Sequence, residues 1–212
     1  MIKVENVTKS FDDNEIVSNL SFEVVTGTVV SLMGASGNGK STLLKILTGQ
    51  IEDFEGSVNV LGKDIRTEKS DIYGKVGIAM DELGVYENFT ARGNLLFFAK
   101  LHKVPSKEVD RLLQLFNLAK DKNKKVKKFS KGMKQRLYLA LAMLKNPQLL
   151  ILDEPHTGLD EKNRNQLNNL LLEYKRKGCT VLLTSHSWED SQAISDRIYD
   201  MKNGKLTEME VA

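Results

Sequence analysis

The stretch Gly34-Ala35-Ser36-Gly37-Asn38-Gly39-Lys40-Ser41-Thr42 decides how this chain folds. It follows the apolar run 29–33, which indicates a buried strand, and it precedes the apolar run 43–47, which indicates a helix. A strand, a glycine-rich loop and a helix in this order form a phosphate-binding loop. The glycines let successive backbone N–H groups point into one concavity, and the helix N-terminus adds positive potential there.

The polar residues at the end of this loop indicate a triphosphate ligand. Lys40 is long enough to reach the β- and γ-phosphates, and Ser41 can offer its hydroxyl to Mg²⁺. An incidental glycine-rich turn would not explain why Lys-Ser-Thr opens the helix. A dinucleotide-binding fingerprint is excluded because Thr42 stands where its third glycine belongs. The predicted nucleotide-binding residues of the loop are Gly34, Ser36, Gly37, Asn38, Gly39, Lys40, Ser41 and Thr42.

Composition limits the class of protein. The chain has 212 residues, of which 41% are hydrophobic and 28% are charged, which is typical of a soluble globular domain with its own core. A net charge of +3 is too small to indicate a nucleic-acid partner. The single cysteine, Cys179, excludes an internal disulfide and a cysteine-based metal site, and its apolar surroundings predict a small core residue.

Hydropathy gives no indication of a membrane span or a signal peptide. The first five residues contain no apolar signal region, and the longest nearly apolar run, 137–144, is far shorter than the roughly 20 residues that cross a bilayer. We therefore expect a cytoplasmic chain that reaches a membrane only through a partner.

The periodicity of apolar residues predicts an α/β fold. Strands are expected near 2–4, 20–24, 58–60, 76–80, 148–152 and 180–184, and helices near 94–101, 109–118, 133–144, 161–177 and 189–195. Strands and helices alternate along much of the chain, which favours a mainly parallel sheet. The predicted fold class is a P-loop NTPase core with an N-terminal antiparallel β subdomain and an inserted helical subdomain.

A second cluster of polar residues follows the apolar run 149–152, which ends in Asp153-Glu154-Pro155. Open α/β sheets bind ligands at the carboxyl ends of their strands. Asp153 can hold Mg²⁺ through water, while Glu154, turned away by strand alternation, can orient and deprotonate a water beside the γ-phosphate. Two surface acids at a strand end are the plainer interpretation, which the phosphate loop disfavours.

Five segments occur in an order that resembles the ATP-binding subunits of ABC transporters. They are the phosphate loop, Phe129-Ser130-Lys131-Gly132-Met133-Lys134-Gln135-Arg136, the acidic strand end, Thr157-Gly158-Leu159-Asp160 and His186. The resemblance covers essentially the whole chain. Ser130-Lys131-Gly132 followed by Gln135 is its most specific part because other phosphate-loop families lack it, although it departs from the common Leu-Ser-Gly-Gly-Gln form.

The resemblance implies roles for single residues. Glu154 would be the catalytic base, with Lys40 and His186 contacting the γ-phosphate, and Asp153 would bind the water shell of Mg²⁺. Phe11 would stack on adenine; a core aromatic is the alternative for Phe11, and a core histidine for His186.

Further roles follow for a head-to-tail dimer of two ATPase subunits, identical or different. Ser130, Gly132 and Gln135 would close on the nucleotide of the opposite subunit, and Asp160 would lie at the seam. The plainer interpretation of Ser130 is a helix N-cap, and both roles are compatible.

Two positions depart from the family pattern. Asp81 stands where the family usually has a glutamine, and we expect it to face the γ-phosphate and contribute to the metal site. His156 stands where threonine is common and is interpreted as a surface residue. The lysine-rich segment 120–134 is interpreted as a solvated loop, which is the commoner explanation for a run of charges.

The resemblance predicts one ABC-type nucleotide-binding domain over residues 1–212, with a core of about 1–81 and 148–212 and a helical subdomain of about 82–147. The expected function is that of an ATP-binding and ATP-hydrolysing subunit that powers an ABC transporter, with export favoured over import. Its expected partners are ATP, Mg²⁺, a second ATPase subunit and separate membrane permease subunits that hold it at the inner face of the cell membrane; no nucleic acid is expected.

Two alternatives stay open at this point. A soluble ABC ATPase acting on nucleic acid or ribosomes would typically resemble fused tandem ATPases or carry long inserted arms, and neither is evident here. A small-molecule phosphate-loop kinase would need an acceptor-binding lid and would not explain 130–135.

Overall fold

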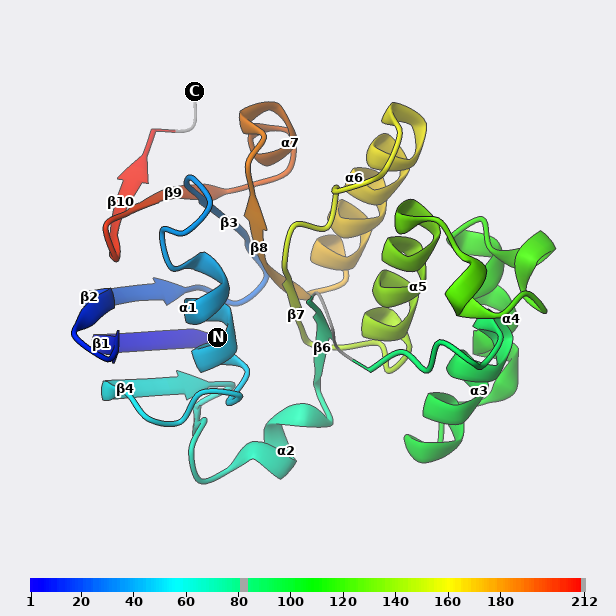
Figure 1. Ribbon diagram of the computed structural model, residues 1–212, viewed down its shortest axis with the longest axis horizontal. Helices are drawn as coiled ribbons and strands as arrows, with labels where there is room; N and C mark the ends of the chain where they lie inside the picture. The colour runs from blue at the N-terminus through cyan, green and yellow to red at the C-terminus, as the bar shows by residue number, and fades with distance from the viewer. Residues whose placement is uncertain (81–83, 211–212) are drawn as a thin grey trace.

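The computed structural model describes residues 1–80 and 84–210, in which two β-sheets and seven α-helices are assigned. The predicted contribution of Asp81 to the metal site lies outside these residues. Figure 1 shows the smaller sheet at one end of the molecule, the larger sheet in the middle and a group of helices at the other end.

The smaller sheet is antiparallel and is built from the first third of the chain. Its strand order is β2-β1-β4-β5, with bounds β1 Ile2–Phe11, β2 Asn14–Val24, β4 Glu55–Val60 and β5 Lys63–Asp64. The turn between β1 and β2 has Asp12 in the left-handed region at a φ of 50°, which Asp tolerates better than most residues. This sheet is the predicted N-terminal antiparallel unit.

The larger sheet is parallel except at one edge. Its order is β10-β9-β3-β8-β7-β6, with bounds β3 Val29–Met33, β6 Val76–Ala79, β7 Leu149–Leu152, β8 Thr180–Ser185, β9 Arg197–Lys202 and β10 Lys205–Met209. Strand β10 runs antiparallel to β9. All residues of β7 and β8 are buried, as expected for central strands covered on both faces. The predicted α/β fold with a mainly parallel sheet is confirmed.

Helices connect the strands and cover the larger sheet. They are α1 Lys40–Leu47, α2 Lys69–Tyr73, α3 Ala91–Leu101, α4 Ser106–Leu115, α5 Lys131–Met143, α6 Glu161–Arg176 and α7 Trp188–Gln192. Helices α3, α4 and α5 follow β6 and precede β7, and they form the group at the end of the molecule opposite the antiparallel sheet (Figure 1). Helix α2 was not predicted because its five residues are too few to show a helical period.

The larger sheet separates two hydrophobic cores. In β7, Leu150 and Leu152 belong to the core shared with helices α3 to α6, whereas Leu149 and Ile151 belong to the core shared with α1 and the antiparallel sheet. This alternation follows from the period of two along a strand. The lysine-rich segment 120–134 was interpreted from the sequence as a loop, but its last four residues belong to α5, and the two short 3₁₀ turns Ala119–Asp121 and Val126–Lys128 fall largely within the rest.

No helix within residues 1–80 and 84–210 has both the length and the apolar character needed to cross a bilayer.

The three central strands end at the same edge of the sheet, because β3 pairs in parallel with β8, and β8 with β7. The phosphate loop, Asp153 and His186 follow these strand ends, so the fold brings the predicted site together.

The contact between Gly77 of β6 and Ala142 of α5 leads to a first prediction. A Cβ added at Gly77 would lie 2.1 Å from the carbonyl oxygen of Ala142, whereas a Cβ at Gly74 would meet nothing within 4 Å. Gly77→Ala should therefore lower the free energy of unfolding by about 1–3 kcal/mol through overpacking, and Gly74→Ala should not. Thermal melting of both variants measures the difference, and equal melting temperatures would contradict this close joint between sheet and helix.

Candidate active site

One cleft at the carboxyl edge of the larger sheet gathers most of the predicted site residues. Its volume is about 410 Å³, and it is lined by the phosphate loop, the end of β1 and the residues that follow β7 and β8. Among the described residues, Ile16 is the one lining residue that the sequence did not single out. The lining residues are Phe11, Ile16, Ser36, Gly37, Gly39, Lys40, Ser41, Thr42, Asp153, Glu154 and His186.

The backbone of the phosphate loop needs glycine for two reasons. Gly34 and Gly39 have φ angles of 141° and 95°, a region that L-residues rarely adopt. Both also pack against neighbouring backbone, because an added Cβ would lie 2.4 Å from the carbonyl oxygen of Met201 at Gly34 and 2.7 Å from that of Ile16 at Gly39. The glycines therefore let the loop sit tightly between β2 and β9.

The side chain of Asn38 serves the scaffold of the loop. Its Nδ2 donates a hydrogen bond of 2.8 Å to the carbonyl oxygen of Met201 in β9. A nucleotide contact by Asn38 stays a prediction, while Ser36 and Gly37 are exposed at the tip of the loop.

Lys40 opens helix α1 at the floor of the cleft. It is buried, and its Nζ donates hydrogen bonds to the carbonyl oxygens of Gly34 at 2.6 Å and Ala35 at 3.2 Å. Burial lowers the pKa of Lys40, an effect that the carboxylates of Glu154 and Asp153 oppose. The ammonium group is thus held close to two acids.

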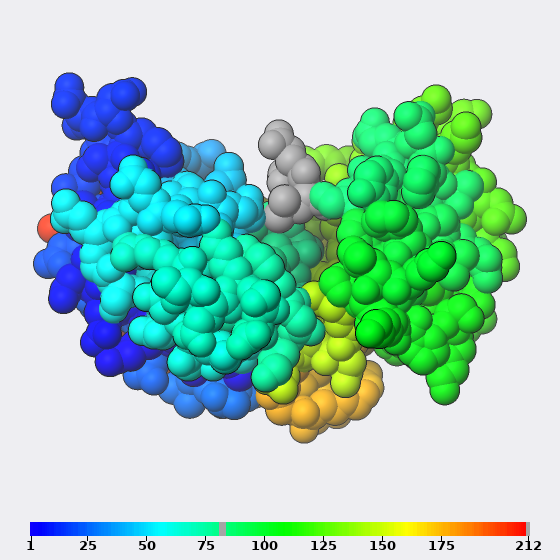
Figure 2. Space-filling view, turned by 90° about the horizontal axis from the view of Figure 1, so that it is seen from below, coloured from blue at the N-terminus to red at the C-terminus, as the bar shows by residue number. Residues whose placement is uncertain are grey.

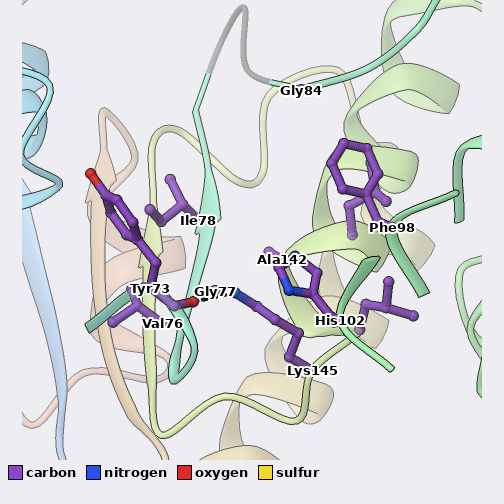
Figure 3. A pocket seen from close by; sticks show the side chains of 11 residues that line it. Tyr73, Val76, Gly77, Ile78, Gly84, Phe98, His102, Ala142 and Lys145 are labelled. Carbon is purple, nitrogen blue, oxygen red and sulfur yellow. Dashed lines mark hydrogen bonds between the residues drawn. The ribbon is translucent and has the colours of Figure 1, made fainter. Parts of the chain in front are cut away.

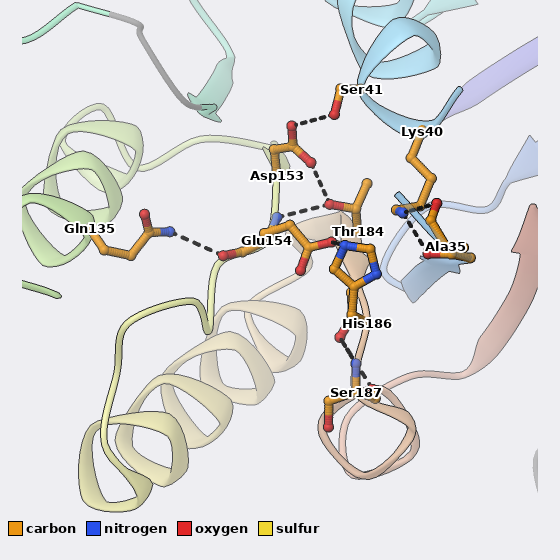
Figure 4. Close-up of polar contacts among 11 residues, drawn as sticks. Ala35, Lys40, Ser41, Gln135, Asp153, Glu154, Thr184, His186 and Ser187 are labelled. Atoms are coloured by element: carbon orange, nitrogen blue, oxygen red, sulfur yellow. Dashed lines mark hydrogen bonds and ion pairs between the residues drawn. The ribbon is translucent and has the colours of Figure 1, made fainter. Parts of the chain in front are cut away.

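A chain of hydrogen bonds joins α1, β7 and β8 across the cleft (Figure 4). Ser41 Oγ donates to Asp153 Oδ2 at 3.0 Å, and Thr184 Oγ1 donates to Asp153 Oδ1 at 2.5 Å. The same Thr184 oxygen accepts from the backbone N–H of Glu154 at 2.8 Å. Thr184 was missed from the sequence; the signal was a hydroxyl near the end of an otherwise apolar strand, two residues before His186.

Glu154 and His186 face each other on the other side of Asp153. Glu154 Oε1 lies 2.9 Å from His186 Nε2, within ion-pair distance, and this buried oxygen accepts no hydrogen bond from the described residues. Burial raises the pKa of Glu154, with Asp153 adding to the rise and His186 and Lys40 opposing it. A partly buried carboxylate with a free acceptor oxygen suits a proton acceptor.

The different directions of Asp153 and Glu154 do not come from strand alternation, as the sequence analysis expected. Strand β7 ends at Leu152, before either acid. Glu154 has a φ of 46°, in the left-handed region, and this turn directs its side chain toward His186. A non-glycine residue in this conformation is strained, and such residues concentrate at functional sites.

Ser130, Gly132 and Gln135 lie at the start of α5 and do not line the cleft within the described part of the chain. Ser130 caps α5, because its hydroxyl accepts from the N–H of Met133 at 3.3 Å. A Cβ at Gly132 would lie 2.3 Å from the carbonyl oxygen of Gly158, so only glycine fits there.

Gln135 is buried and points into its own chain. Its Nε2 donates to the carbonyl oxygens of Glu154 at 3.4 Å and Pro155 at 3.3 Å. This amide therefore connects α5 to the turn that carries Glu154, a role that the sequence did not reveal, and a nucleotide contact by Gln135 stays a prediction.

Phe11 stands at the rim of the cleft with 47% of its surface exposed, which rules out the core aromatic considered for it. Lys9 Nζ lies 4.9 Å from the centre of its ring. An exposed ring beside a phosphate loop is free to stack on a base.

Two residues after Glu154 the sequence interpretation was wrong. His156 is not a surface residue, because only 4% of its surface is exposed and its Nε2 lies 2.6 Å from Asn168 Oδ1 in α6. Asp160, four residues on, is the N-cap of α6 and accepts from the N–H of Asn163 at 2.8 Å.

Comparison with known proteins identifies the family of the chain. The family model for ABC transporters matches residues 17–157. An uncharacterized ABC transporter ATP-binding protein, YybJ of Bacillus subtilis, is 35% identical over 97% of this chain and 94% of its own length. The bacitracin transport ATP-binding protein BcrA of Bacillus licheniformis is 34% identical over 98% of this chain and 69% of its own, and the Nod factor export ATP-binding protein I of Rhizobium meliloti is 35% identical over 96% and 62%.

The fold has a close counterpart among solved structures. The dimeric structure of MJ0796, a bacterial ABC transporter cassette, superposes with a TM-score of 0.91 at 25% identity, covering 100% of this chain and 99% of that one. The same cassette in a dimeric post-hydrolysis state bound to ADP and Pi gives a TM-score of 0.88. With the phosphate loop, the acidic strand end and the α5 segment in place, the chain belongs to the ABC transporter family and is an ATPase of the ABC type.

Proposed function

We propose that this chain hydrolyses ATP in the cleft described above to drive transport through separate membrane subunits. The observation that carries the proposal is Glu154 Oε1, which accepts no hydrogen bond from the described residues and lies in one cleft with Lys40, Asp153 and His186. We further propose that residues 1–212 form one nucleotide-binding unit, with a core of about 1–81 and 148–212 and a helical unit of about 82–147.

The proposed nucleotide site combines three kinds of contact. The loop N–H groups and Lys40 bind the phosphates, Phe11 stacks on adenine, and Ser41 with Asp153 holds Mg²⁺. The hydroxyl and carboxylate oxygens of the last pair are the hard ligands that Mg²⁺ prefers, and they already lie 3.0 Å apart. Bound there, the ion would neutralise charge on the phosphates.

Glu154 is the proposed general base and His186 its neighbour at the γ-phosphate. Glu154 takes a proton from the attacking water at its free oxygen, while His186 and Lys40 offset the negative charge of the carboxylate. Thr184 fixes both Asp153 and the backbone of Glu154, which keeps the two acids in separate roles.

A second subunit would complete the site. Ser130 is exposed and caps the N-terminus of the 13-residue helix α5, and a helix N-terminus is a favourable place for a phosphate. We propose that this helix end and Asp160 meet the nucleotide and seam of a partner subunit, as the family's dimeric cassettes suggest.

The proposed contact with a permease lies on the helical unit. Tyr86, Phe89 and Phe97 are 47%, 44% and 42% exposed, and the ring of Tyr86 lies 5.2 Å from that of Phe89 and 5.1 Å from that of Phe97. We call these three residues the aromatic patch. Exposed apolar clusters of this kind mark interaction surfaces.

A groove beside the aromatic patch strengthens this assignment. It has a volume of about 250 Å³ and is lined by β6 on one side and by α3 and α5 on the other, where Phe98, which stacks on Tyr86, and Ala142 face Ile78 (Figure 3). The space-filling view shows the core and the helical unit as two masses on either side of this region (Figure 2). A membrane partner seated here would hold the chain at the inner face of the cell membrane.

Export is the proposed direction. The relatives include a bacitracin transport protein and a Nod factor export protein, and both are ATP-binding proteins by name. The alternative, a soluble ABC ATPase acting on nucleic acid or ribosomes, is not favoured by any of these relatives.

A prediction for the phosphate site concerns Lys40. Lys40→Ala removes a charge-assisted donor worth roughly 1.5–3 kcal/mol at the phosphates, so the dissociation constant for ATP should rise by about tenfold or more. Lys45→Ala is the control, because Lys45 lies on the same helix and its side chain is exposed. Isothermal titration measures both, and unchanged ATP affinity of Lys40→Ala would contradict the assignment.

A prediction for hydrolysis concerns Glu154. Glu154→Gln should keep ATP binding, lose hydrolysis and accumulate an ATP-bound dimer, because the amide cannot accept the proton of the attacking water. In the unchanged protein, kcat should fall as pH drops through the raised pKa of Glu154, which lies above the usual glutamate value. ATPase rates across pH and gel filtration with ATP test both points, and near-normal hydrolysis by Glu154→Gln would rule out the base.

A prediction for transport concerns the membrane partner. Purification of the tagged chain from its native cells in mild detergent should bring down a membrane permease, identified by mass spectrometry. Phe97→Ala should reduce its recovery because it removes a ring from the aromatic patch, whereas Val25→Ala, at an equally exposed position outside the patch, should not. Recovery of ribosomes or nucleic acid in place of a permease would favour the alternative function.

A further inference from the structure

The turn that carries Glu154 is clamped from two helices. From α5, Gln135 donates to the carbonyl oxygens of Glu154 and Pro155. From α6, Arg164 Nε donates to the carbonyl oxygen of Leu159 at 3.3 Å. Within the turn, the N–H of Thr157 donates to the carbonyl oxygen of Glu154 at 3.0 Å, so residues 154–159 form one compact unit.

His156 lies in the middle of this unit, and its side chain makes a hydrogen bond to α6. Nε2 lies 2.6 Å from Asn168 Oδ1, and because an amide oxygen only accepts, Nε2 is the donor. The other ring nitrogen, Nδ1, is buried without a hydrogen-bond partner among the described residues. A neutral imidazole suits this arrangement, since Nδ1 then carries a lone pair and not an unsatisfied N–H.

The charges around His156 do not offer it another partner. Arg164 of α6 and Asp190 of α7 are the charged groups that face it, and they pair with each other at 2.9 Å. Burial lowers the pKa of His156, which keeps the ring uncharged. The hydrogen bond to Asn168 is therefore the polar contact that fixes the orientation of this ring.

We propose that His156, through its hydrogen bond to Asn168, is a positioning residue that holds the turn bearing Glu154 and so keeps the Glu154 carboxylate aligned for hydrolysis. This hydrogen bond is needed because Glu154 adopts a strained left-handed backbone conformation, which the turn would leave if it were not held in place. The groups proposed to bind the phosphates are not part of this turn, because the phosphate loop lies between β3 and α1 and Lys40 is the first residue of α1. The hydrogen bond thus serves the rate of hydrolysis and not the affinity for ATP; the inference rests on the proposed role of Glu154.

Asn168 offers a test on a partly exposed side chain of α6, and Asn169 beside it is exposed and serves as a matched control. Asn168→Ala should lower kcat for ATP by about tenfold, as expected when a reacting group is no longer held in alignment. The dissociation constant for ATP should change by less than about twofold. Asn169→Ala should leave both values unchanged, and circular dichroism melting verifies that each variant is folded at the assay temperature.

Conservative rescue distinguishes positioning from packing. Asn168→Asp keeps an acceptor oxygen at the same reach and should retain kcat within about twofold. His156→Leu removes the donor and puts an apolar side chain of similar size in its place, so its kcat should match that of Asn168→Ala. The double variant His156→Leu/Asn168→Ala should hydrolyse ATP no more slowly than either single variant.

The outcomes separate this inference from the role of Glu154. If Asn168→Ala and His156→Leu hydrolyse ATP at the normal rate while Glu154→Gln does not, the positioning role is wrong and the base stands. Loss of ATP affinity in step with kcat, or failure of Asn168→Asp to rescue, also overturns the inference. Normal hydrolysis by Glu154→Gln would instead remove the base on which the inference rests.

Discussion

The parallel pairing of β3, β8 and β7 is the constraint on which the rest of the structure depends. Met33 of β3 lies opposite Ser185 of β8, and Leu183 of β8 lies opposite Leu152 of β7. Because side chains alternate along each strand, a slip of one residue would exchange the apolar side chains that face the two cores and disrupt the close packing of both. The same register places the phosphate loop, Asp153 and His186 at one edge, so stability and the alignment of the site come from the same set of contacts.

Electrostatics at this edge explain why the site tolerates its charges. Lys40 is buried, which alone would disfavour its charged form, but it sits close to Asp153 and Glu154, which favour it. Glu154 experiences the opposite balance, since burial raises its pKa and the nearby cation lowers it. Each group therefore favours the charged form of the other, with Asp153 adding to the support of Lys40 and His186 to that of Glu154.

The sequence predicted the parts of the site that follow from local patterns. The phosphate loop, the acids after β7 and the cap at Ser130 each combine a residue type with an adjacent strand or helix. Thr184 and His156 were missed or misjudged for a shared reason: their roles depend on partners far along the chain, Asp153 and Asn168. Period and spacing report burial and local geometry, whereas a hydrogen bond across elements needs the tertiary fold.

Gln135 shows how the two sides of the molecule are connected. Ser130 is the N-cap of α5, and Gln135, further along the same helix, donates hydrogen bonds to the carbonyl oxygens of Glu154 and Pro155. Gln135 and the N-terminus of α5 belong to one helix, so a contact that shifted this helix as a whole would also change the hydrogen bonds that Gln135 makes at Glu154. Close packing of Gly132 against Gly158 adds a second link between the same two segments. Closure of a partner subunit on α5 would therefore act on the turn that carries Glu154 through two contacts, Gln135 with Glu154 and Pro155, and Gly132 with Gly158. Neither contact involves the phosphate loop.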